Sequence, residues 1–505
     1  MGGVPTKVFL TVHFEASVEP AAPPQRYLMA HWRTLLAALH RYLGIGLCLL
    51  FAMWFASGLV MLFHPFPALT EAQRFACLEP IDLGTTAVHS SLFERASTDD
   101  TEALRLTSLM GRAVVHRHGA GSIDTYWADT GDGPIRVSTA HATSVAERCG
   151  HGPASNVETI GDDQWTVHEG FAGHRPLHRV SLDDPSGTVL YVSSRSGEVV
   201  QQTTRTQRGW NWVGSVPHWI YPTVLRRHWE LWDSLVWWLA ALGSVGTCVG
   251  LILGLIRWRR SAKSAVSPFR GALYWHHVSG LGVGLVVLAW ILSGGLSMDH
   301  GRLFSTGAPT GEQRSRVAGT TRFDGNPQTI FGVNQPIKEI EWLRVAGRSY
   351  IAARTGSGMQ QLATTDDTAQ VFGASFSSEL FAGVRSTLVP GADLTEQAVL
   401  DTFDTYYYGR EHAPRPLPVL RLRYDDPAST WLHLDLTTGR LAERLDSGRR
   451  TYRFWFNALH SHDLPWMLDR PALRLSWMSL LCAAGFLFSC NGVWLAWKRL
   501  RVLRA

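Results

Sequence analysis

The sequence lacks the short motifs by which many enzymes hold a nucleotide or a catalytic metal. It contains no phosphate-binding glycine loop, no dinucleotide-binding glycine fingerprint, no paired Cys-x-x-Cys and no His-Glu-x-x-His. Charged residues are also scarce, at 18% of the 505 residues, whereas 45% are hydrophobic. The mean hydropathy of −0.02 fits neither a soluble enzyme nor a many-helix transporter, and it predicts a mixture of membrane and water-facing parts.

Long apolar runs are few, but they are sufficient for four membrane crossings. A bilayer core of about 30 Å needs about 20 consecutive apolar residues in a helix. Four stretches meet this requirement, namely Leu43–Phe63, Leu235–Ile256, Val278–Met298 and Leu473–Trp497. The intervals between the first and second runs and between the third and fourth are polar, and each is long enough to fold as a domain.

These features predict a membrane α-helical bundle of four transmembrane helices that carries two outer α+β domains. The expected segments are a flexible tail (1–30), an interfacial helix with the first span (31–64), outer domain 1 (65–230), the second span (231–257), a short loop (258–272), the third span (273–299), outer domain 2 (300–470), the fourth span (471–498) and a C-terminal segment (499–505). Within the outer domains, residues 179–202 and 420–444 alternate apolar and polar residues around an Asp-Asp-Pro turn, which predicts β-hairpins.

The net charge of +5 is concentrated beside the apolar runs, as in RWRRSAK at 257–263 and KRLR at 498–501. Such clusters are typical of cytoplasmic membrane edges and not of a nucleic-acid-binding face, so we expect no nucleic-acid partner. Both termini and the 258–272 loop are therefore predicted to be cytoplasmic, with both outer domains on the opposite side. No cleaved signal peptide is predicted, and the first span is expected to serve as the insertion signal.

Only six cysteines are present, and four of them lie in the predicted spans. Cys77 and Cys149 share outer domain 1, where an oxidising compartment would permit a disulfide.

The two halves of the chain repeat each other. The first and third apolar runs superimpose without a gap, and a second ungapped alignment joins the ends of the outer domains to the helices that follow. The first alignment pairs His40 with His276, Gly44 with Gly280, Trp54 with Trp290, Ser57 with Ser293 and His64 with His300, and the second pairs Asp183 with Asp425, Arg208 with Arg450 and His218 with His460. A tandem duplication with pseudo-two-fold symmetry is predicted.

Three histidine pairs recur at equivalent places in the two halves, at or near the membrane edges. They are His40 with His276, His64 with His300, and His218 with His460. Two neutral imidazoles on facing helices can hold a haem iron from both sides, and glycines near them let a flat macrocycle approach the backbone. A single histidine at a membrane edge is more often an interfacial or hydrogen-bonded residue, so the repetition is what favours haem.

The spacing along the first helix limits which histidines can act together. His40 and His64 are 24 residues apart, which corresponds to about 36 Å of helix. His218 and His460 would bring a second haem nearer to the first only if the segment before each later helix folds back toward the bundle. Because Cys-x-x-Cys-His is absent, any haem would be haem b, bound without a covalent link.

The motifs LHRYLGIG (39–46), WHHVSGLG (275–282) and DDPSGTVLYVSSRSGEV in outer domain 1 resemble the PepSY-associated transmembrane family, over almost the whole chain from about residue 30. The resemblance implies two periplasmic PepSY-like domains on a bacterial inner-membrane protein. It also implies an inner-membrane reductase with two haems that reduces ferric siderophores in the periplasm and releases iron. By motif, His40 and His276 would ligate one haem iron, and His218 and His460 the other.

Several alternatives stay open at this point. His277 rivals His276, His462 rivals His460, and His64 and His300 are further haem-ligand candidates outside the family pattern. The implied partners are a ferric siderophore, a cytoplasmic or quinol electron donor and membrane lipid. The alternative function is a haem-free membrane protein that binds or senses a peptide or regulates a protease.

Overall fold

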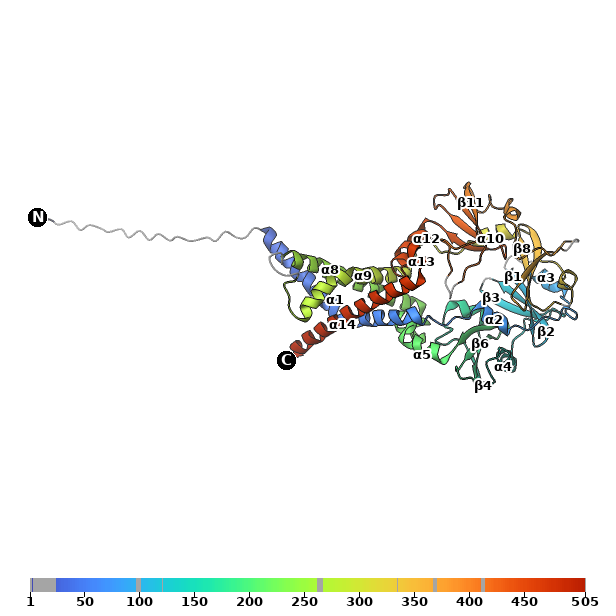
Figure 1. Cartoon of the computed structure of the whole chain (residues 1–505), viewed down its shortest axis with the longest axis horizontal. Helices are drawn as coiled ribbons and strands as arrows, with labels where there is room; N and C mark the ends of the chain where they lie inside the picture. The colour runs from blue at the N-terminus through green and yellow to red at the C-terminus, as the bar shows by residue number, and fades with distance from the viewer. Residues whose placement is uncertain are drawn as a thin grey trace.

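The protein is described from a computed structural model that covers residues 2, 24–96, 101–119, 121–260, 267–333, 335–366, 370–409 and 414–504. A helical bundle forms one end of the molecule and a β-rich outer module forms the other (Figure 1). The Pro24 end of the first helix and the Arg504 end of the last both lie at the end of the bundle remote from the sheets (Figure 1). Most of the predicted tail, apart from residue 2 and residues 24–30, falls outside the described residues.

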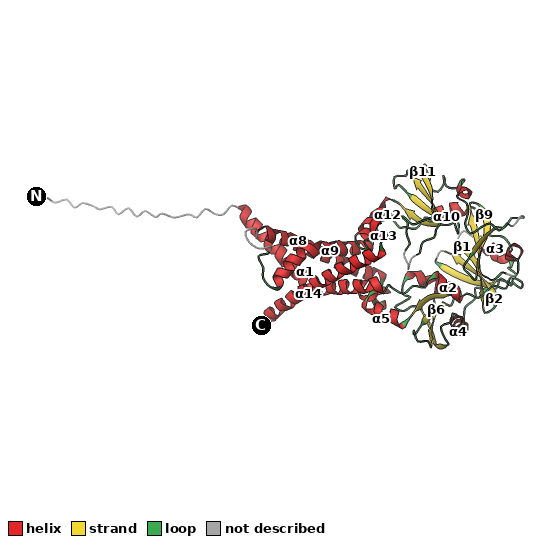
Figure 2. Cartoon of the chain, in the orientation of Figure 1, coloured by secondary structure: helices red, strands yellow, loops and turns green. Residues whose placement is uncertain are grey.

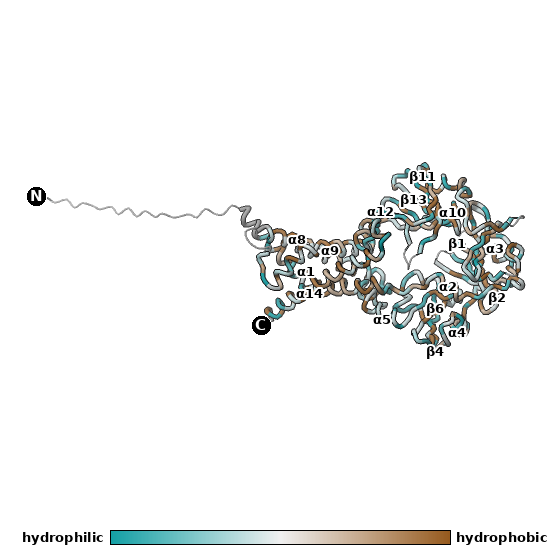
Figure 3. The backbone as a smooth tube through the Cα atoms, in the orientation of Figure 1, coloured by the Kyte–Doolittle hydropathy of each residue, from teal (hydrophilic) through white to brown (hydrophobic). Residues whose placement is uncertain are grey.

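Among the described residues, four helices are long and apolar enough to cross a membrane, as predicted: α1 (Pro24–Phe63), α8 (Trp229–Arg260), α9 (Ala272–Ser297) and α14 (Pro471–Arg504). Helices α1 and α9 each pack against both α8 and α14, which closes a four-helix bundle. The bundle carries much of the hydrophobic colouring of the chain (Figure 3). The predicted interfacial helix and first span form one uninterrupted helix, α1, which begins at Pro24.

All four helices contribute to the bundle core, where aromatic side chains fill the centre. Phe55 of α1 packs against Trp290 of α9, with ring centres 5.7 Å apart. Glycines on the neighbouring helices make room for such rings, since a Cβ on Gly243 would lie 3.0 Å from the ring of Phe51. Small residues at helix contacts let backbones approach closely in a membrane, where packing replaces the hydrophobic effect.

The outer module contains three antiparallel sheets (Figure 2). The first outer segment supplies β1 (Thr101–Leu109), β2 (Arg112–Gly119), β3 (Ser122–Trp127), β4 (Ala154–Ile160), β5 (Leu177–Leu182), β6 (Val189–Ser193) and β7 (Val199–Thr203). The second supplies β8 (Ile337–Val345), β9 (Arg348–Thr355), β10 (Gln360–Thr364), β11 (Leu394–Leu400), β12 (Val419–Tyr424), β13 (Trp431–Asp435) and β14 (Leu441–Leu445). The sheet orders are β10-β9-β8-β1-β2-β3, β4-β5-β6-β7 and β11-β12-β13-β14.

The six-stranded sheet joins the two outer segments, which corrects the prediction of two separate domains at 65–230 and 300–470. Strand β1 pairs with β8 in antiparallel register, with Leu104 opposite Trp342 and Arg105 opposite Glu341. Each segment alone would leave the backbone groups of β1 or β8 unpaired at a sheet edge, and pairing them satisfies both. The side chains of Leu104 and Trp342 are fully buried in the shared core.

The predicted hairpins are present as β5–β6 and β12–β13. In the first turn Asp184 accepts hydrogen bonds from the backbone N–H and the hydroxyl of Thr188, at 2.6 and 2.8 Å. Asp426 does the same for Thr430 in the second turn, at 2.6 and 2.9 Å. The paired acidic residues therefore stabilise turns, the role that Asp commonly takes there.

Short helices connect these elements. They are α2 (Glu71–Cys77), α3 (Ser90–Ala96), α4 (Thr139–Arg148), α5 (Arg205–Val213), α6 (Ser215–His218), α7 (Thr223–Arg226), α10 (Gly311–Ala318), α11 (Pro327–Phe331), α12 (Ser447–Tyr452) and α13 (Pro465–Leu468), with short 3-10 segments at Glu169–His174 and Ser378–Phe381. A π-helical turn, η3 (Arg453–Ala458), follows α12 directly. A disulfide joins Cys77 at the end of α2 to Cys149 after α4.

A buried ion-pair network fastens the two outer segments together. Arg105 pairs with Glu198 at 2.6 Å and with Glu339 at 2.9 Å, and Arg74 reaches Glu339 at 2.8 Å. Burial alone would raise the pKa of Glu198, but Arg105 and Arg74 hold that pKa well below its usual range.

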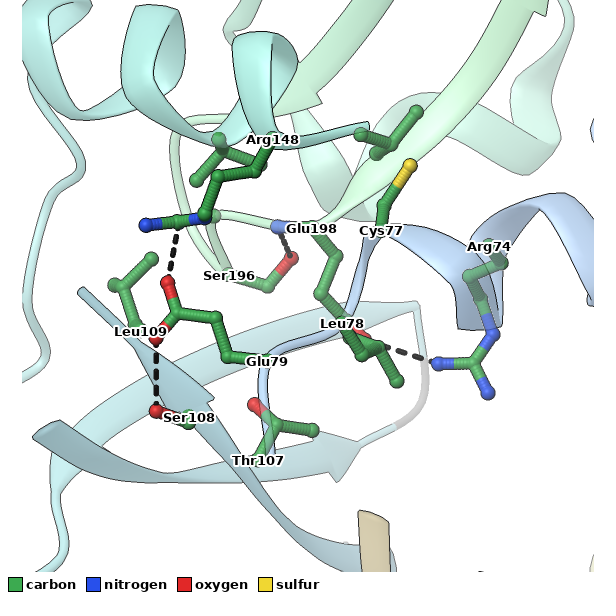
Figure 4. A pocket seen from close by; sticks show the side chains of 13 residues that line it. Arg74, Cys77, Leu78, Glu79, Thr107, Ser108, Leu109, Arg148, Ser196 and Glu198 are labelled. Atoms are coloured by element: carbon green, nitrogen blue, oxygen red, sulfur yellow. Dashed lines mark hydrogen bonds and ion pairs between the residues drawn. The ribbon is translucent and has the colours of Figure 1, made fainter. Parts of the chain in front are cut away.

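The small cavity next to this network is lined by charged groups that already have partners, such as Arg148 with Glu79, and by Cys77 of the disulfide (Figure 4).

Candidate functional site

The first histidine pair lies at the end of the bundle remote from the sheets, and we call it the far pair. His40 of α1 and His276 of α9 face each other with ring centres 6.1 Å apart. The Nδ1 atom of His40 lies 2.9 Å from the carbonyl oxygen of Gly246 on α8, so Nε2 is the nitrogen left for a metal. A Cβ on Gly250 would lie 2.9 Å from His40 Nδ1, which shows how closely this imidazole approaches the α8 backbone.

His276 completes the far pair with a nitrogen that lacks a partner. Its Nδ1 atom is buried and makes no hydrogen bond within the described part of the chain. Its ring stacks on Phe488 of α14, with ring centres 5.1 Å apart and planes 17° apart. A buried polar atom without a partner is costly in an apolar bundle, so it points to a group that the protein chain itself does not supply.

The second pair lies at the sheet-facing end of the bundle, and we call it the near pair. After α5 the chain folds back through α6, which packs against α1. His218 Nδ1 then lies 3.1 Å from the carbonyl oxygen of Trp54 and 3.2 Å from the hydroxyl of Ser57. Gly58 permits this crossing, since a Cβ there would lie 3.2 Å from His218 Cε1.

The second half places His460 in the same way. Its Nδ1 atom lies 3.2 Å from the carbonyl oxygen of Trp290 and 3.2 Å from the hydroxyl of Ser293. A Cβ on Gly294 would lie 3.3 Å from His460 Cε1. The ring centres of His218 and His460 are 6.4 Å apart. The fold-back that the spacing along α1 requires is thus present in both halves, and it brings the two rings of the near pair together, with their planes 63° apart.

Burial favours the neutral form of His218. It lowers the pKa of His218 to about 4, and the hydrogen bond with the Trp54 backbone offsets part of that shift. A neutral imidazole keeps the lone pair that a metal ligand needs.

Both pairs have a geometry that fits a metal ion held between two imidazoles. With metal–nitrogen bonds of about 2.0 Å, two such rings have centres about 6 Å apart. Near the far pair, a Cβ on Gly44, Gly46 or Gly282 would have no neighbouring atom within 4 Å, and all three glycines are exposed on the surface of the bundle. The imidazoles of each pair are therefore spaced as two ligands of one haem iron would be, and the ligand assignment itself stays a prediction.

The rival histidines adjacent in the chain have other partners. His277 is buried, with Nδ1 2.9 Å from the hydroxyl of Ser267 and Nε2 2.9 Å from the carbonyl oxygen of Gly254. The ring nitrogens of His462 face two indoles, since the Nε1 atoms of Trp290 and Trp477 lie 3.2 and 3.1 Å away. The geometry favours His276 and His460 as the members of the pairs.

The remaining repeated histidines have different surroundings in the two halves. His64 stacks on Trp210, with ring centres 4.5 Å apart and planes 3° apart. His300 Nδ1 lies 2.5 Å from Asp233 Oδ2, and its ring packs against Trp237. Trp210 contacts His64, and Asp233 and Trp237 contact His300, but among the residues that the structure describes the equivalents in the other half make no such contact. The structure therefore shows no common site for His64 and His300.

Sequence reasoning missed the groups that orient the near pair. The repeat alignment already paired Ser57 with Ser293 and Trp54 with Trp290. That repetition could have indicated that these residues hold the near pair. It also missed Trp290 as a bridge, because this side chain contacts both Phe55 and His460, with ring centres 5.7 and 6.4 Å apart.

Comparison with known proteins adds one match. The family model described as PepSY-associated TM region matches residues 37–499, a span that contains all four histidines of the two pairs. No curated protein matches this chain.

Proposed function

The chain belongs to the PepSY-associated TM family, and from that premise we propose that it is a haem-containing reductase of a bacterial inner membrane. In this proposal it carries electrons across the membrane, reduces ferric siderophore complexes in the periplasm and so releases iron. Both termini are cytoplasmic, and the outer module, a pair of PepSY-like units related by tandem duplication, faces the periplasm. The electron donor is a cytoplasmic reductant or a quinol.

One observation carries the proposal: two histidine pairs, one toward each end of the bundle, have ring centres 6.1 and 6.4 Å apart. Trp54 and Ser57, whose carbonyl and hydroxyl hold His218, stand 14 and 17 residues after His40 on α1, which corresponds to about 20 to 25 Å of helix. Two redox centres at that spacing would divide the thickness of a bilayer of about 30 Å between them.

The residues of the chain hold, orient and shield these centres. The Gly246 carbonyl fixes one ring of the far pair, and the Ser57 and Ser293 hydroxyls fix the two rings of the near pair. Such partners set which nitrogen ligates and tune the basicity of the ligand. When bound, haem b would supply one-electron redox chemistry at each pair.

The substrate follows from the chemistry of iron. Ferric iron is held by hard oxygen ligands, and reduction to the ferrous state lowers its charge and weakens that hold, so reduction also releases the metal. No general acid or base is required, which agrees with the lack of catalytic motifs in the sequence.

The first experiment is a reduced-minus-oxidised visible spectrum of the purified protein, with haem b quantified per chain. Two haems per chain are expected. Substitution of His40 or His276 by Ala removes the far haem, and substitution of His218 or His460 removes the near one, while His64→Ala and His300→Ala retain both. Protein that contains no haem after expression with ample haem supply would instead favour the haem-free binding protein.

A second experiment tests the direction of electron flow. The protein is reduced in detergent and mixed with a ferric chelate, and its reoxidation is followed by absorbance while ferrous iron is captured by a chromogenic chelator. Reoxidation with matching ferrous iron is expected. Haem that stays reduced in the presence of every ferric chelate would contradict the reductase.

A further inference from the structure

The two halves differ most in the helical segment that leads to each histidine of the near pair. Counted from the aligned Asp183 and Asp425, Arg449 and Arg453 stand where the first half has Gln207 and Asn211. In the loop before β12, Tyr406 occupies the place of Trp165, because Asp404 accepts a hydrogen bond from the backbone N–H of Tyr406 as Asp163 does from that of Trp165. The first half builds the same helical segment without these two arginines, so the fold does not require them.

Arg449 and Arg453 stand one helical turn apart, and each lies over tyrosine rings. We call this group of five side chains the arginine–tyrosine cluster: Arg449, Arg453, Tyr406, Tyr408 and Tyr452. The guanidinium carbon of Arg453 lies 4.4 Å from the ring centre of Tyr408 and 5.7 Å from that of Tyr406. That of Arg449 lies 4.1 Å from the ring centre of Tyr452. The rings hold the arginines by cation–π attraction and leave their N–H groups available for hydrogen bonds.

The charges of the cluster are not balanced by its surroundings. Most neighbouring arginines have carboxylate partners: Arg421 pairs with Asp404, Arg423 with Glu396, Arg444 with Asp446 and Arg415 with Glu443. Arg450 instead donates to the carbonyl oxygens of Ser429 and Leu445. Within the described residues, no carboxylate lies in ion-pairing distance of Arg449 or Arg453. Glu443 interacts electrostatically with Arg449 and Arg453, but it is buried and already forms an ion pair with Arg415 at 2.7 Å.

The cluster adjoins the near pair. Arg453 begins the π-helical turn η3, and Phe456 of that turn stacks on His460 with ring centres 5.2 Å apart. Tyr408 donates a hydrogen bond of 2.6 Å to Asp463, which follows His460 in the chain. Such π-helical turns are rare and frequently mark functional sites. Tyr406 is 38% exposed, so the cluster is open to solvent on the side of the outer module.

We propose that the arginine–tyrosine cluster is the docking site for an anionic ferric chelate, one that carries carboxylate or catecholate groups. This inference rests on the proposed reductase function and assigns its substrate class. Guanidinium groups bind carboxylate and catecholate oxygens through paired hydrogen bonds, and tyrosine rings pack against flat aromatic ligands. A cationic ferric hydroxamate lacks the anionic oxygens and the aromatic rings for these contacts, and the positive charges of Arg449 and Arg453 would repel it.

Anionic lipid headgroups would also attract arginines near a membrane surface. The orientation of the cluster favours the chelate, because Arg453 stacks on Tyr406 and Tyr408 of the outer module. The next residue in the chain, Phe454, is 56% exposed. In this turn a large apolar side chain, and not an arginine, is therefore the most exposed group.

The test uses the full chain in nanodiscs of neutral lipid and redox-inert gallium complexes as probes. An anionic gallium catecholate is compared with a cationic gallium hydroxamate by calorimetry. The variants are Arg449→Gln and Arg453→Asn, which install the residues of the first half. Arg205→Gln removes one positive charge from α5, the equivalent helix of the other half, and serves as the matched control.

The wild type is expected to bind the anionic complex at least about tenfold more tightly than the cationic one. Each cluster variant is expected to weaken anion binding about tenfold, as loss of a charge-assisted contact does, with haem content and thermal midpoint unchanged. Arg205→Gln is expected to bind like the wild type.

Equal affinity for the two complexes, unchanged anion binding in both cluster variants, or binding that requires anionic lipid would each overturn the docking site. A protein that contains haem and reduces ferric chelates without regard to their charge would retain the proposed function and lose this inference. Gallium has no accessible lower oxidation state here, so charge-selective binding by protein without haem would support the docking site and contradict the reductase.

Discussion

His276 and His277 are neighbours in the chain, yet their ring nitrogens meet opposite conditions. His277 has a partner at each nitrogen, whereas Nδ1 of His276 is buried without one inside the described part of the chain. The sequence alone left these two residues as rivals, because both begin the same helix. The direction in which each side chain leaves α9 separates them, and that direction follows from the packing of α8 and α14 around it.

Substitution of these two histidines should therefore have different effects. His276→Ala is expected to remove one haem per chain with little loss of stability. His277→Ala should retain both haems but remove the hydrogen bonds of this ring with the Ser267 hydroxyl and the Gly254 carbonyl, at a cost of about 1–3 kcal/mol. Haem quantitation and the thermal unfolding midpoint measure the two effects. Loss of haem in His277→Ala alone would reverse the assignment.

Acid should weaken the outer module through its buried histidines. His116 is fully buried between the hydroxyls of Thr107 and Thr125, and burial lowers its pKa to about 3. Its neutral form contributes stability above the unfolded pKa of about 6.5, and this contribution is lost as the pH falls toward the folded value.

Between about pH 6 and pH 4 this residue alone should cost up to about 1.4 kcal/mol per pH unit. Thermal midpoints at pH 7.5, 6.0 and 5.0 measure the loss, and His116→Gln should reduce its slope. A variant with the same pH dependence as the wild type would assign the acid sensitivity to other groups.

At the scale of elements, the decisive feature is the return of α6 onto α1. The repeat alignment identified His218 and His460 as equivalent, but no local pattern showed that the short helix before each span folds back. The apolar runs were easier to predict, because the thickness of a bilayer fixes their length. The structure extends α8 and α14 past those runs into basic residues, since a helix does not have to end where the apolar core does.

The crossing of α6 over α1 predicts an effect of bulk at Gly58. A Cβ there would lie 3.2 Å from His218 Cε1, and the two methyl groups of valine would press further into the ring. Gly58→Val is thus expected to lower haem content from two to one per chain by displacing His218. Gly209→Ala is the control, because a Cβ at that position on α5 has no neighbour within 4 Å. Two haems per chain in Gly58→Val would show that α6 can shift on α1 without displacing His218.

At the scale of the whole molecule, the outer segments are joined by a sheet that sequence reasoning did not foresee. The hairpins β5–β6 and β12–β13 could be predicted because their turn residues are local. The pairing of β1 with β8 could not, because the two strands are far apart in the chain and either could have found another partner.

The shared sheet predicts that neither outer segment is stable alone. A soluble fragment of residues 65–230 would expose the edge of β1 and leave Arg105 and Glu198 without Glu339 beside them. Arg105 and Glu198 would keep each other as partners, but removal of one carboxylate from a buried ion-pair network is destabilising. This fragment should lack a cooperative thermal transition, and co-expression with residues 300–470 should restore it. Cooperative unfolding of either fragment by itself would contradict the joined module.

The β1–β8 pairing also sets an order of events during synthesis. Ribosomes add about 5–20 residues per second, so the 228 residues from Leu109 to Ile337 take roughly 10 to 45 seconds. During that interval α8 and α9 are inserted into the membrane, and the edge of β1 that later pairs with β8 remains without hydrogen-bond partners from β8. The nascent chain is then most vulnerable to aggregation and to proteases, and its completion depends on the arrival of a strand made after the second and third membrane crossings.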